Sequence, residues 1–214
     1  FDSALHTAVD AIDKLHTTAE SHDRVMLLEV MGRHAGWIAL HAGIAGGADV
    51  ILLPEIPYSM AAVTQQLKRR IAAGRHFSIV VVAEGARPVG GEESYLGPAR
   101  PGQARRLGGA AERVAQGLLG EVDIDCRVTV LGHLQRGGSP SPMDRLLGTR
   151  FGYEAVELLA RGQFDHMVCL RTPSITAVPI ADAVARRNAV DPAGEVCRAA
   201  RAIGISLGDP AEVT

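Results

Sequence analysis

The sequence predicts an α/β fold in which a parallel β-sheet is covered by helices on both faces. Two observations lead to this prediction. Short apolar runs such as residues 79–83 have the length and composition of strands buried on both sides. Segments with apolar residues at helical spacing lie between these runs, so helices and strands alternate along the chain.

In the first half of the chain, the pattern predicts a helix over residues 4–15, a strand over 24–30, a helix over 35–45, a strand over 50–53, a helix over 59–73 and a strand over 77–83. Ser59 is a typical N-cap residue, and Gly74 follows the last apolar position of the same helix.

In the second half, the pattern predicts a helix over residues 109–118, a strand over 126–131, a helix over 143–160, strands over 166–170 and 175–178, and a helix over 195–203. Residues 87–107 are different, because glycine, proline, arginine and glutamate dominate and periodicity disappears. We expect this segment to be a long, mobile surface insertion.

Composition excludes several classes of protein. The chain has 214 residues with 22 basic and 24 acidic side chains, and a net charge of −2 does not suit a dedicated nucleic-acid binder. No apolar run approaches the ~20 residues that span a bilayer, so we expect no membrane association. The cysteines, Cys126, Cys169 and Cys197, form no CxxC pair and indicate neither a zinc site nor a disulfide framework. We therefore expect a cytoplasmic protein.

Arginine is used far more than lysine, since Lys14 and Lys68 are the only lysines. This bias has two interpretations. It can reflect codon usage, or some of the arginines can bind phosphate through their planar fork of donors. A GxSxG match at residues 204–208 lacks the later histidine that a nucleophile elbow requires, so we interpret it as a chance match.

Polar residues follow three of the predicted strands where each strand ends. Met31-Gly32-Arg33 follows strand 24–30, Glu84 follows strand 77–83, and a run from His133 to Arg136 follows strand 126–131. Because ligands of open parallel sheets bind at the carboxyl ends of strands, these residues are candidates for one site. Arg24 and Arg127 lie at the opposite, entering ends of two of these strands.

The residue types at these strand ends suit a hydroxylated, phosphorylated small molecule. Gly32 allows close approach of a ligand to the backbone, and the helix predicted to begin near Ala35 would direct free N–H groups at a phosphate. Arg33, His133 and Arg136 are cationic donors, and Glu84 can accept from a hydroxyl. Individually, each has an alternative role: a solvated charge at a strand end, a capping or core histidine, or half of a surface ion pair.

The motifs at these strand ends resemble those of the 6-phosphofructokinase family. They are EVMGR at residues 29–33, IAGG at 44–47, PE at 54–55, Glu84, and LGHLQRGGSP at 131–140, in family order. The resemblance implies a phosphofructokinase-like fold and transfer of a phosphoryl group to O1 of fructose 6-phosphate, giving fructose 1,6-bisphosphate. HAGW at residues 34–37 and the insertion after Glu84 resemble the bacterial branch that uses ATP or pyrophosphate as donor.

The resemblance also assigns site residues. It places these residues in the sugar-phosphate site: Arg24, Met31, Gly32, Arg33, Glu84, Arg127, His133, Leu134, Gln135 and Arg136. Arg33 is implied to be catalytic, because it lies near the transferred phosphoryl group and offsets its charge. Arg24 and Arg127 are implied to reach the site of a neighbouring subunit, so that the functional form is a homo-oligomer.

Some parts of the family pattern are absent. The glycine-rich GGD segment for the nucleotide and the TIDND segment, with the aspartate base and the aspartate linked to Mg²⁺, do not occur in this chain. We expect both to lie upstream of Phe1, together with the first part of the nucleotide domain and the Mg²⁺ ligands, and we expect the chain alone to be inactive. Of the positions that match the family's effector site, Arg75 and Asp49 keep the expected charge and His16 and Ala73 do not.

The resemblance implies three segments. Residues 1–136 form the fructose-6-phosphate-binding domain, residues 137–180 return to the largely absent nucleotide-binding domain, and residues 181–214 form a C-terminal helical segment. We expect the apolar face of the returning segment to be exposed. Two alternatives remain open: a stand-alone sugar-phosphate-binding module, and a non-catalytic interaction subunit.

Overall fold

The computed structural model describes residues 1–98, 102, 105–185 and 188–213. It divides into two compact units. The larger unit comprises Ala4–Gly138 and Ala189–Thr214, and the smaller unit comprises Phe1–Ser3 and Ser139–Asn188.

The larger unit is built on a parallel sheet with strand order β2-β3-β1-β4. The strands are β1 (Val25–Val30), β2 (Val50–Leu52), β3 (Ser78–Ala83) and β4 (Cys126–Val130). The helices are α1 (Asp2–Glu20), α2 (Trp37–Ala45), α3 (Met60–Ala72), α4 (Ala110–Leu118) and α7 (Glu195–Ala202), with short 3₁₀ helices η1 (Gly132–Arg136) and η2 (Pro210–Glu212). The predicted parallel sheet is therefore confirmed.

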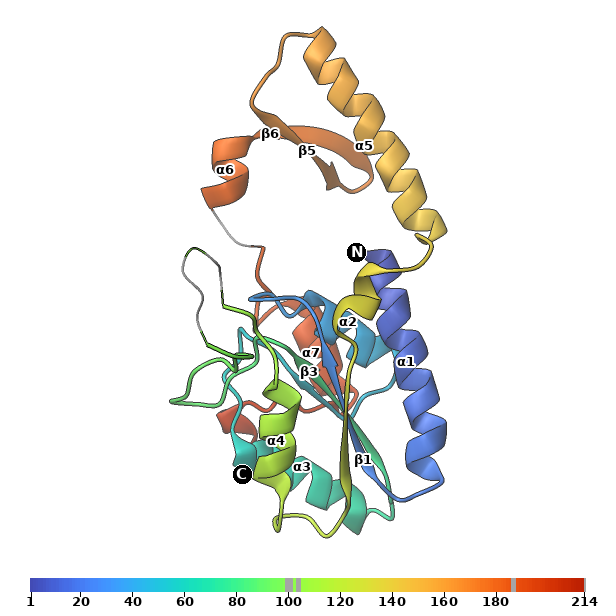
Figure 1. Ribbon diagram of the computed structural model, residues 1–214, viewed down its shortest axis with the longest axis vertical. Helices are drawn as coiled ribbons and strands as arrows, with labels where there is room; N and C mark the ends of the chain where they lie inside the picture. Colours follow the sequence, from blue (N-terminus) through green and yellow to red (C-terminus); the bar gives the residue numbers. More distant parts are fainter. Residues whose placement is uncertain (99–101, 103–104, 186–187, 214) are drawn as a thin grey trace. The chain divides into compact units, whose positions relative to one another are not determined.

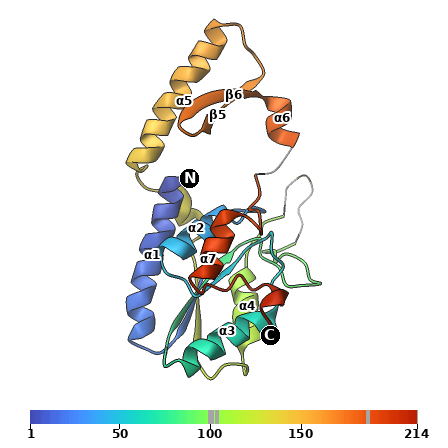
Figure 2. The same ribbon diagram turned by 180° about the vertical axis from the view of Figure 1, so that it is seen from behind.

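Helices cover both faces of this sheet, as the sequence predicts (Figures 1 and 2). Alternate residues of β1 point to opposite faces: Leu28 packs with residues of α1, α2 and α7, whereas Leu27 packs with residues of α3 and α4. Every residue of β1 and of β3 is buried. This explains why both strands are nearly continuous apolar runs without polar alternation.

Local sequence signals account for the ends of α3. The hydroxyl of Ser59 accepts a hydrogen bond from the backbone N–H of Ala62, which satisfies one of the free donors at the start of the helix. Gly74 follows the C-cap with φ of +75°, a left-handed conformation that glycine adopts without a steric penalty.

The C-terminal segment returns to the sheet edge beside β2. The backbone N–H of Ile51 donates to the carbonyl of Ser206 at 2.9 Å, and the N–H of Ser206 donates to the carbonyl of Asp49 at 3.1 Å. Val50 and Ser206 form a parallel bridge. The GxSxG match at residues 204–208 is therefore part of an extended stretch that pairs with the edge of the sheet beside β2.

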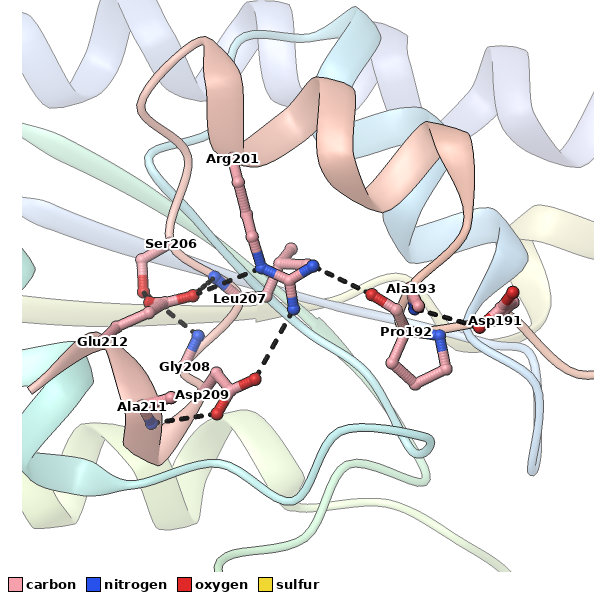
Figure 3. A network of polar contacts seen from close by, with 10 residues as sticks. All are labelled: Asp191, Pro192, Ala193, Arg201, Ser206, Leu207, Gly208, Asp209, Ala211 and Glu212. Atoms are coloured by element: carbon pink, nitrogen blue, oxygen red, sulfur yellow. Dashed lines mark hydrogen bonds and ion pairs between the residues drawn. The ribbon is translucent and has the colours of Figure 1, made fainter.

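Side chains around Arg201 fix this segment (Figure 3). The Arg201 guanidinium donates to the carbonyl of Pro192 at 2.9 Å and lies 3.6 Å from Asp209 and 3.9 Å from Glu212. Glu212 in turn accepts from the Ser206 hydroxyl and from the N–H of Leu207. Because the Ser206 hydroxyl is buried and bonded to a carboxylate, Ser206 has a structural role here.

The smaller unit contains α5 (Pro142–Ala160), β5 (His166–Arg171), β6 (Ser174–Pro179) and α6 (Ile180–Ala185). The two strands pair antiparallel, with His166 opposite Pro179. Large apolar side chains are exposed on this unit, as expected for the returning segment: Met143, Leu146, Tyr153, Val156, Leu159, Phe164, Met167, Leu170, Ile180 and Val184.

The two units differ from the three predicted segments. Helix α6 contacts β5 and β6, so residues 180–185 group with the smaller unit rather than with a C-terminal segment that begins at 181. Residues 189–213 belong to the larger unit, because the stretch around Ser206 bonds to β2. The role of each segment in ligand binding stays a prediction.

The segment predicted as a surface insertion is partly ordered by backbone pairing. The N–H of Leu96 donates to the carbonyl of Arg106 at 2.8 Å, and Tyr95 forms an antiparallel bridge with Leu107. Residues 99–101 and 103–104 of this insertion lie outside the described residues. Within the described ranges, no helix is both long and apolar enough to cross a membrane.

Replacing Leu28 by alanine should lower the free energy of unfolding of the larger unit by about 2–5 kcal/mol, because the side chain is fully buried between the sheet and its helices. Urea denaturation followed through the fluorescence of Trp37, the single tryptophan, measures this change. Leu119→Ala is the control, since Leu119 is 74% exposed and its loss should cost less than about 0.5 kcal/mol. Equal costs for the two variants would contradict this description of the core.

Candidate functional site

A cavity of about 210 Å³ lies at the carboxyl ends of β1, β3 and β4. Because β1 pairs with both other strands in parallel, their carboxyl ends meet at one edge of the sheet. The cavity is lined by Glu29, Met31, Arg33, Glu84, Leu96, Arg105, Arg106, Leu107, Gly108, Val130, Gly132, His133 and Arg136.

The loop after β1 is held in place by Glu84. One carboxylate oxygen of Glu84, Oε1, accepts from the backbone N–H groups of Gly32 at 3.2 Å and Arg33 at 2.8 Å. Arg33 adopts a left-handed conformation with φ of +52°, which costs a non-glycine residue about 1 kcal/mol. The two hydrogen bonds from this loop offset that cost. Both use Oε1, and no donor to Oε2 of Glu84 occurs among the described residues.

Gly85 is required by the close approach of the same loop. A Cβ atom on Gly85 would lie 2.1 Å from the carbonyl oxygen of Arg33, well inside the contact distance of real side chains. The two strand ends are therefore packed backbone to backbone at this point, which fixes the position of Arg33 relative to β3.

Gln135 links the η1 helix to the end of β1. Its side-chain oxygen Oε1 accepts from the backbone N–H of Met31 at 2.7 Å, and the residue is only 5% exposed. Gln135 is therefore a positioning residue for Met31, and it does not line the cavity. Its neighbour Leu134 is 70% exposed and lines a separate shallow hollow with His133 and Thr7.

Glu29 is a buried carboxylate in the floor of the cavity. It is 2% exposed, and it accepts from the backbone N–H groups of Gly109 at 3.1 Å and Ala111 at 2.9 Å. These are the free donors at the start of α4, so Glu29 caps that helix from β1. Burial raises the pKa of Glu29 above its ordinary value of 4.5, and the nearby carboxylate of Glu84 adds to the rise, while the backbone donors oppose it.

Arg24 and Arg127 lie at the other end of the sheet, as their sequence positions predict. Met26 of β1 pairs with Arg127 of β4, and Arg24 comes directly before β1. Both guanidinium groups form ion pairs with Asp125, at 3.3 Å for Arg24 and 2.8 Å for Arg127. Neither arginine lines the cavity.

A carboxylate of the same chain contacts the start of α2. The N–H of Gly36, the N-cap residue, donates to both carboxylate oxygens of Glu55, at 3.0 and 3.2 Å. Glu55 also accepts from the N–H of Val190 at 2.8 Å. Glu55 therefore lies at the N-cap of α2, and the expectation that the start of this helix binds phosphate stays a prediction.

Glu29, Arg105 and Arg106 line the cavity but are not among the site residues predicted from the sequence. A signal was present for Glu29, because it is the single charged residue in an otherwise apolar buried strand. Arg105 and Arg106 precede the Gly108-Gly109 pair at the start of α4. Their approach to the cavity depends on pairing within the insertion, which no local pattern encodes.

A larger hollow of about 700 Å³ lies on the opposite side of the sheet from α1, between α3 and α4. Its lining includes Lys68 and Glu121, which form an exposed ion pair at 3.7 Å, and Arg69. No strand end reaches it, so we place the candidate site in the smaller cavity. No group of three or more His, Cys, Asp or Glu side chains suited to a metal ion occurs among the residues that the structure describes.

Residues 1–159 match the family model for phosphofructokinase. The chain belongs to the phosphofructokinase family. It is 56% identical over 209 residues to an ATP-dependent 6-phosphofructokinase of Chloroflexus aggregans, a match that covers 98% of this chain and 57% of the relative. It is 49% identical over 212 residues to ATP-dependent 6-phosphofructokinase 2 of Clostridium perfringens, covering 98% of this chain and 58% of that protein. The chain thus spans somewhat more than half the length of these curated phosphofructokinases.

Solved phosphofructokinase structures share its fold. The structure of phosphofructokinase from Saccharomyces cerevisiae superposes with a TM-score of 0.73 at 32% identity, covering 86% of this chain and 23% of the yeast chain. The fold is shared as well with a pyrophosphate-dependent phosphofructokinase from Marinobacter aquaeolei, with a TM-score of 0.72 at 22% identity, covering 95% of this chain and 53% of that chain. The phosphofructokinase-like fold predicted from the sequence is confirmed.

Replacing Gly85 by alanine should shift the backbone at Arg33 and destabilise the larger unit by about 1–3 kcal/mol, because the new Cβ overlaps a carbonyl oxygen that cannot rotate away. Amide NMR shifts of residues 31–34 and urea denaturation measure the two effects. Gly148→Ala on α5 is the control, since a Cβ at Gly148 meets no atom within 4 Å. Unchanged shifts at residues 31–34 in Gly85→Ala would contradict the close packing.

The raised pKa of Glu29 predicts a specific pH dependence. The folded state holds the Glu29 proton to higher pH than the unfolded state, so the free energy of unfolding should decrease as pH rises from about 4.5 through the folded pKa. Glu29→Gln should remove this contribution, and Glu121→Gln, at an exposed position, should not. Urea denaturation across this range tests the prediction. Parallel pH profiles for wild type and Glu29→Gln would contradict it.

Proposed function

We propose that the protein of which this chain forms all or part transfers a phosphoryl group from ATP to O1 of fructose 6-phosphate, giving fructose 1,6-bisphosphate. The observation that carries the proposal is the convergence of Arg33, Glu84, His133 and Arg136 from three strand ends on one cavity. Two cationic side chains, a histidine and a carboxylate suit a sugar that carries both hydroxyls and a phosphate. The names of the relatives support ATP as the donor.

We assign roles to the cavity residues from their positions. Arg33 offsets charge on the transferred phosphoryl group and is the catalytic residue of this chain. Oε2 of Glu84 accepts from a sugar hydroxyl, and Arg136 also contacts the sugar. Met31 and Gly32 present the backbone of the β1 loop, and His133 binds the 6-phosphate. Gln135 acts through Met31, and Leu134 borders the site next to His133.

We propose a homo-oligomer in which Arg24 and Arg127 bind the 6-phosphate in the site of a neighbouring subunit. Their position at the amino end of the sheet supports this role, because they lie away from the cavity of their own chain. The Arg127 side chain is 55% exposed, so it is accessible to a partner, and the shared Asp125 holds both guanidinium groups together.

Mg²⁺ would accompany the nucleotide and neutralise its phosphate charge. The described residues of this chain provide no cluster for it, so we assign no residue here to Mg²⁺. The donor is tested by an enzymatic assay of the polypeptide that the gene encodes. The assay mixture contains fructose 6-phosphate and either ATP or pyrophosphate. Turnover with ATP supports the proposal. Turnover with pyrophosphate but not with ATP would show that pyrophosphate is the donor. Binding of the sugar phosphate without turnover with either donor would support a binding module.

In that polypeptide, Arg33→Ser should lower kcat by roughly 10²–10³-fold with a smaller effect on KM, because the lost contact acts on charge in the transition state. Arg127→Ser should instead raise the KM for fructose 6-phosphate by about tenfold or more. Steady-state kinetics measure both, with Arg198→Ser on α7 as the control for loss of one exposed arginine. Equal effects of both substitutions on kcat alone would contradict the assigned roles.

A further inference from the structure

The insertion between β3 and α4 brings two additional arginines to the candidate site. Arg105 and Arg106 line the same cavity as Arg33, His133 and Arg136, although they come from a segment that sequence patterns mark only as a surface insertion. The insertion is therefore a wall of the cavity in the part that the structure describes.

Backbone contacts on both sides fix the wall. Leu96 and Gly108 donate their N–H groups to the carbonyls of Arg106 and Ser94, at 2.8 and 3.2 Å, which forms a short antiparallel ladder. Directly after this ladder, the Glu29 carboxylate caps the start of α4 at Gly109 and Ala111. Arg106 thus lies in the chain between this ladder and the N–H groups that the buried Glu29 caps.

The side chain of Arg105 is held by a ring rather than by a carboxylate. Its guanidinium carbon lies 3.7 Å from the centroid of the Tyr95 ring, a cation–π arrangement that orients the group without using its N–H donors on a carboxylate of the described residues. The Tyr95 hydroxyl donates to Glu93 at 2.7 Å, and Glu93 also contacts His34 at 2.8 Å. Burial opposes ionisation of Glu93, but these contacts with Tyr95 and His34 together lower its pKa.

The cavity has more positive than negative charge. Its lining includes four arginines, namely Arg33, Arg105, Arg106 and Arg136, together with His133. Its two carboxylates, Glu29 and Glu84, already accept from backbone N–H groups. Among the described residues, none of the four arginines forms an ion pair with a carboxylate. Unpaired guanidinium groups around a concavity attract an anion, and their fork of donors fits phosphoryl oxygens.

We propose that Arg105 and Arg106 bind phosphoryl oxygens of the sugar phosphate, so that residues 105–106 of the insertion form a phosphate-binding wall contributed by the same chain as the cavity. This inference rests on the proposed function for the identity of the sugar. It adds to the arginines that the proposed oligomer contributes from a neighbouring subunit, because Arg105 and Arg106 reach their own cavity. A single chain therefore binds phosphate without a partner.

Isothermal titration of the 214-residue chain tests this inference, with fructose 6-phosphate, inorganic phosphate and unphosphorylated fructose as the probes. The double variant Arg105→Gln/Arg106→Gln should bind fructose 6-phosphate at least about tenfold more weakly than wild type. Its affinity for inorganic phosphate should fall by a similar factor. Arg198→Gln, which removes one exposed charge on α7, should change the affinity less than about twofold. The emission of Trp37 confirms that each variant is folded.

A second pair of variants separates orientation from charge. Tyr95→Phe keeps the ring under Arg105 and should retain most of the affinity, whereas Tyr95→Leu removes the ring and should weaken phosphate binding several-fold. Equal affinity of Tyr95→Phe and Tyr95→Leu would contradict the orienting role of Tyr95, and with it the part of the proposal that concerns Arg105.

The outcomes distinguish this inference from the proposed function. If the chain binds fructose 6-phosphate better than phosphate and the double variant binds it equally well, the phosphate-binding wall is overturned and the proposed function stands. If the double variant no longer binds inorganic phosphate but wild type binds fructose 6-phosphate no better than phosphate, the phosphate-binding role of Arg105 and Arg106 is supported and the proposed sugar is wrong. If wild type binds neither probe, the proposal that one chain binds phosphate is overturned.

Discussion

The parallel pairing of β1 with both β3 and β4 is the constraint on which the candidate site depends. It places three strand ends that are far apart in the chain, at Val30, Ala83 and Val130, at one edge of the sheet. Arg33, Glu84 and Arg136 meet there because each follows its strand by a few residues. The same pairing places Arg24 and Arg127 together at the opposite edge, where Asp125 bonds to both.

Three carboxylates that accept backbone N–H donors fix the loops and helix starts around this sheet. Glu84 holds the β1 loop, Glu29 holds the start of α4, and Glu55 holds the start of α2, each by accepting two or more backbone N–H donors. A carboxylate that accepts such donors compensates for part of its desolvation, and it satisfies backbone N–H groups that lack a partner within their own helix or strand. Glu29 and Glu84 also line the cavity, so the carboxylates that fix its walls are the source of its negative charge.

Much of this fold can be predicted from the sequence, because β1 and β3 are continuous apolar runs between helical patterns. The residues at the strand ends can also be predicted, since order along the chain fixes which end each occupies.

Two features of the site could not be predicted from the sequence. The start of α2 is capped by Glu55, 19 residues later, and a long-range contact of this kind leaves no local pattern. Arg105 and Arg106 reach the cavity through a ladder within an insertion that lacks periodicity.

In the smaller unit, local sequence patterns predict the strands and α5 but not the position of α6. Its strands and α5 are predicted within a few residues, yet α6 has no clear signal and packs with β5 and β6. The grouping of α6 with this unit depends on a tertiary contact, whereas the later α7 packs its buried Cys197 and Ala200 with α1 and α2.

The most direct test of the account is a crystal structure of the chain with fructose 6-phosphate bound. We predict that the phosphate lies in the cavity at the carboxyl ends of β1, β3 and β4, within about 3 Å of at least one arginine donor, with a sugar hydroxyl bonded to Glu84. A ligand in the larger hollow between α3 and α4, or one in the cavity with no arginine contact, would contradict it.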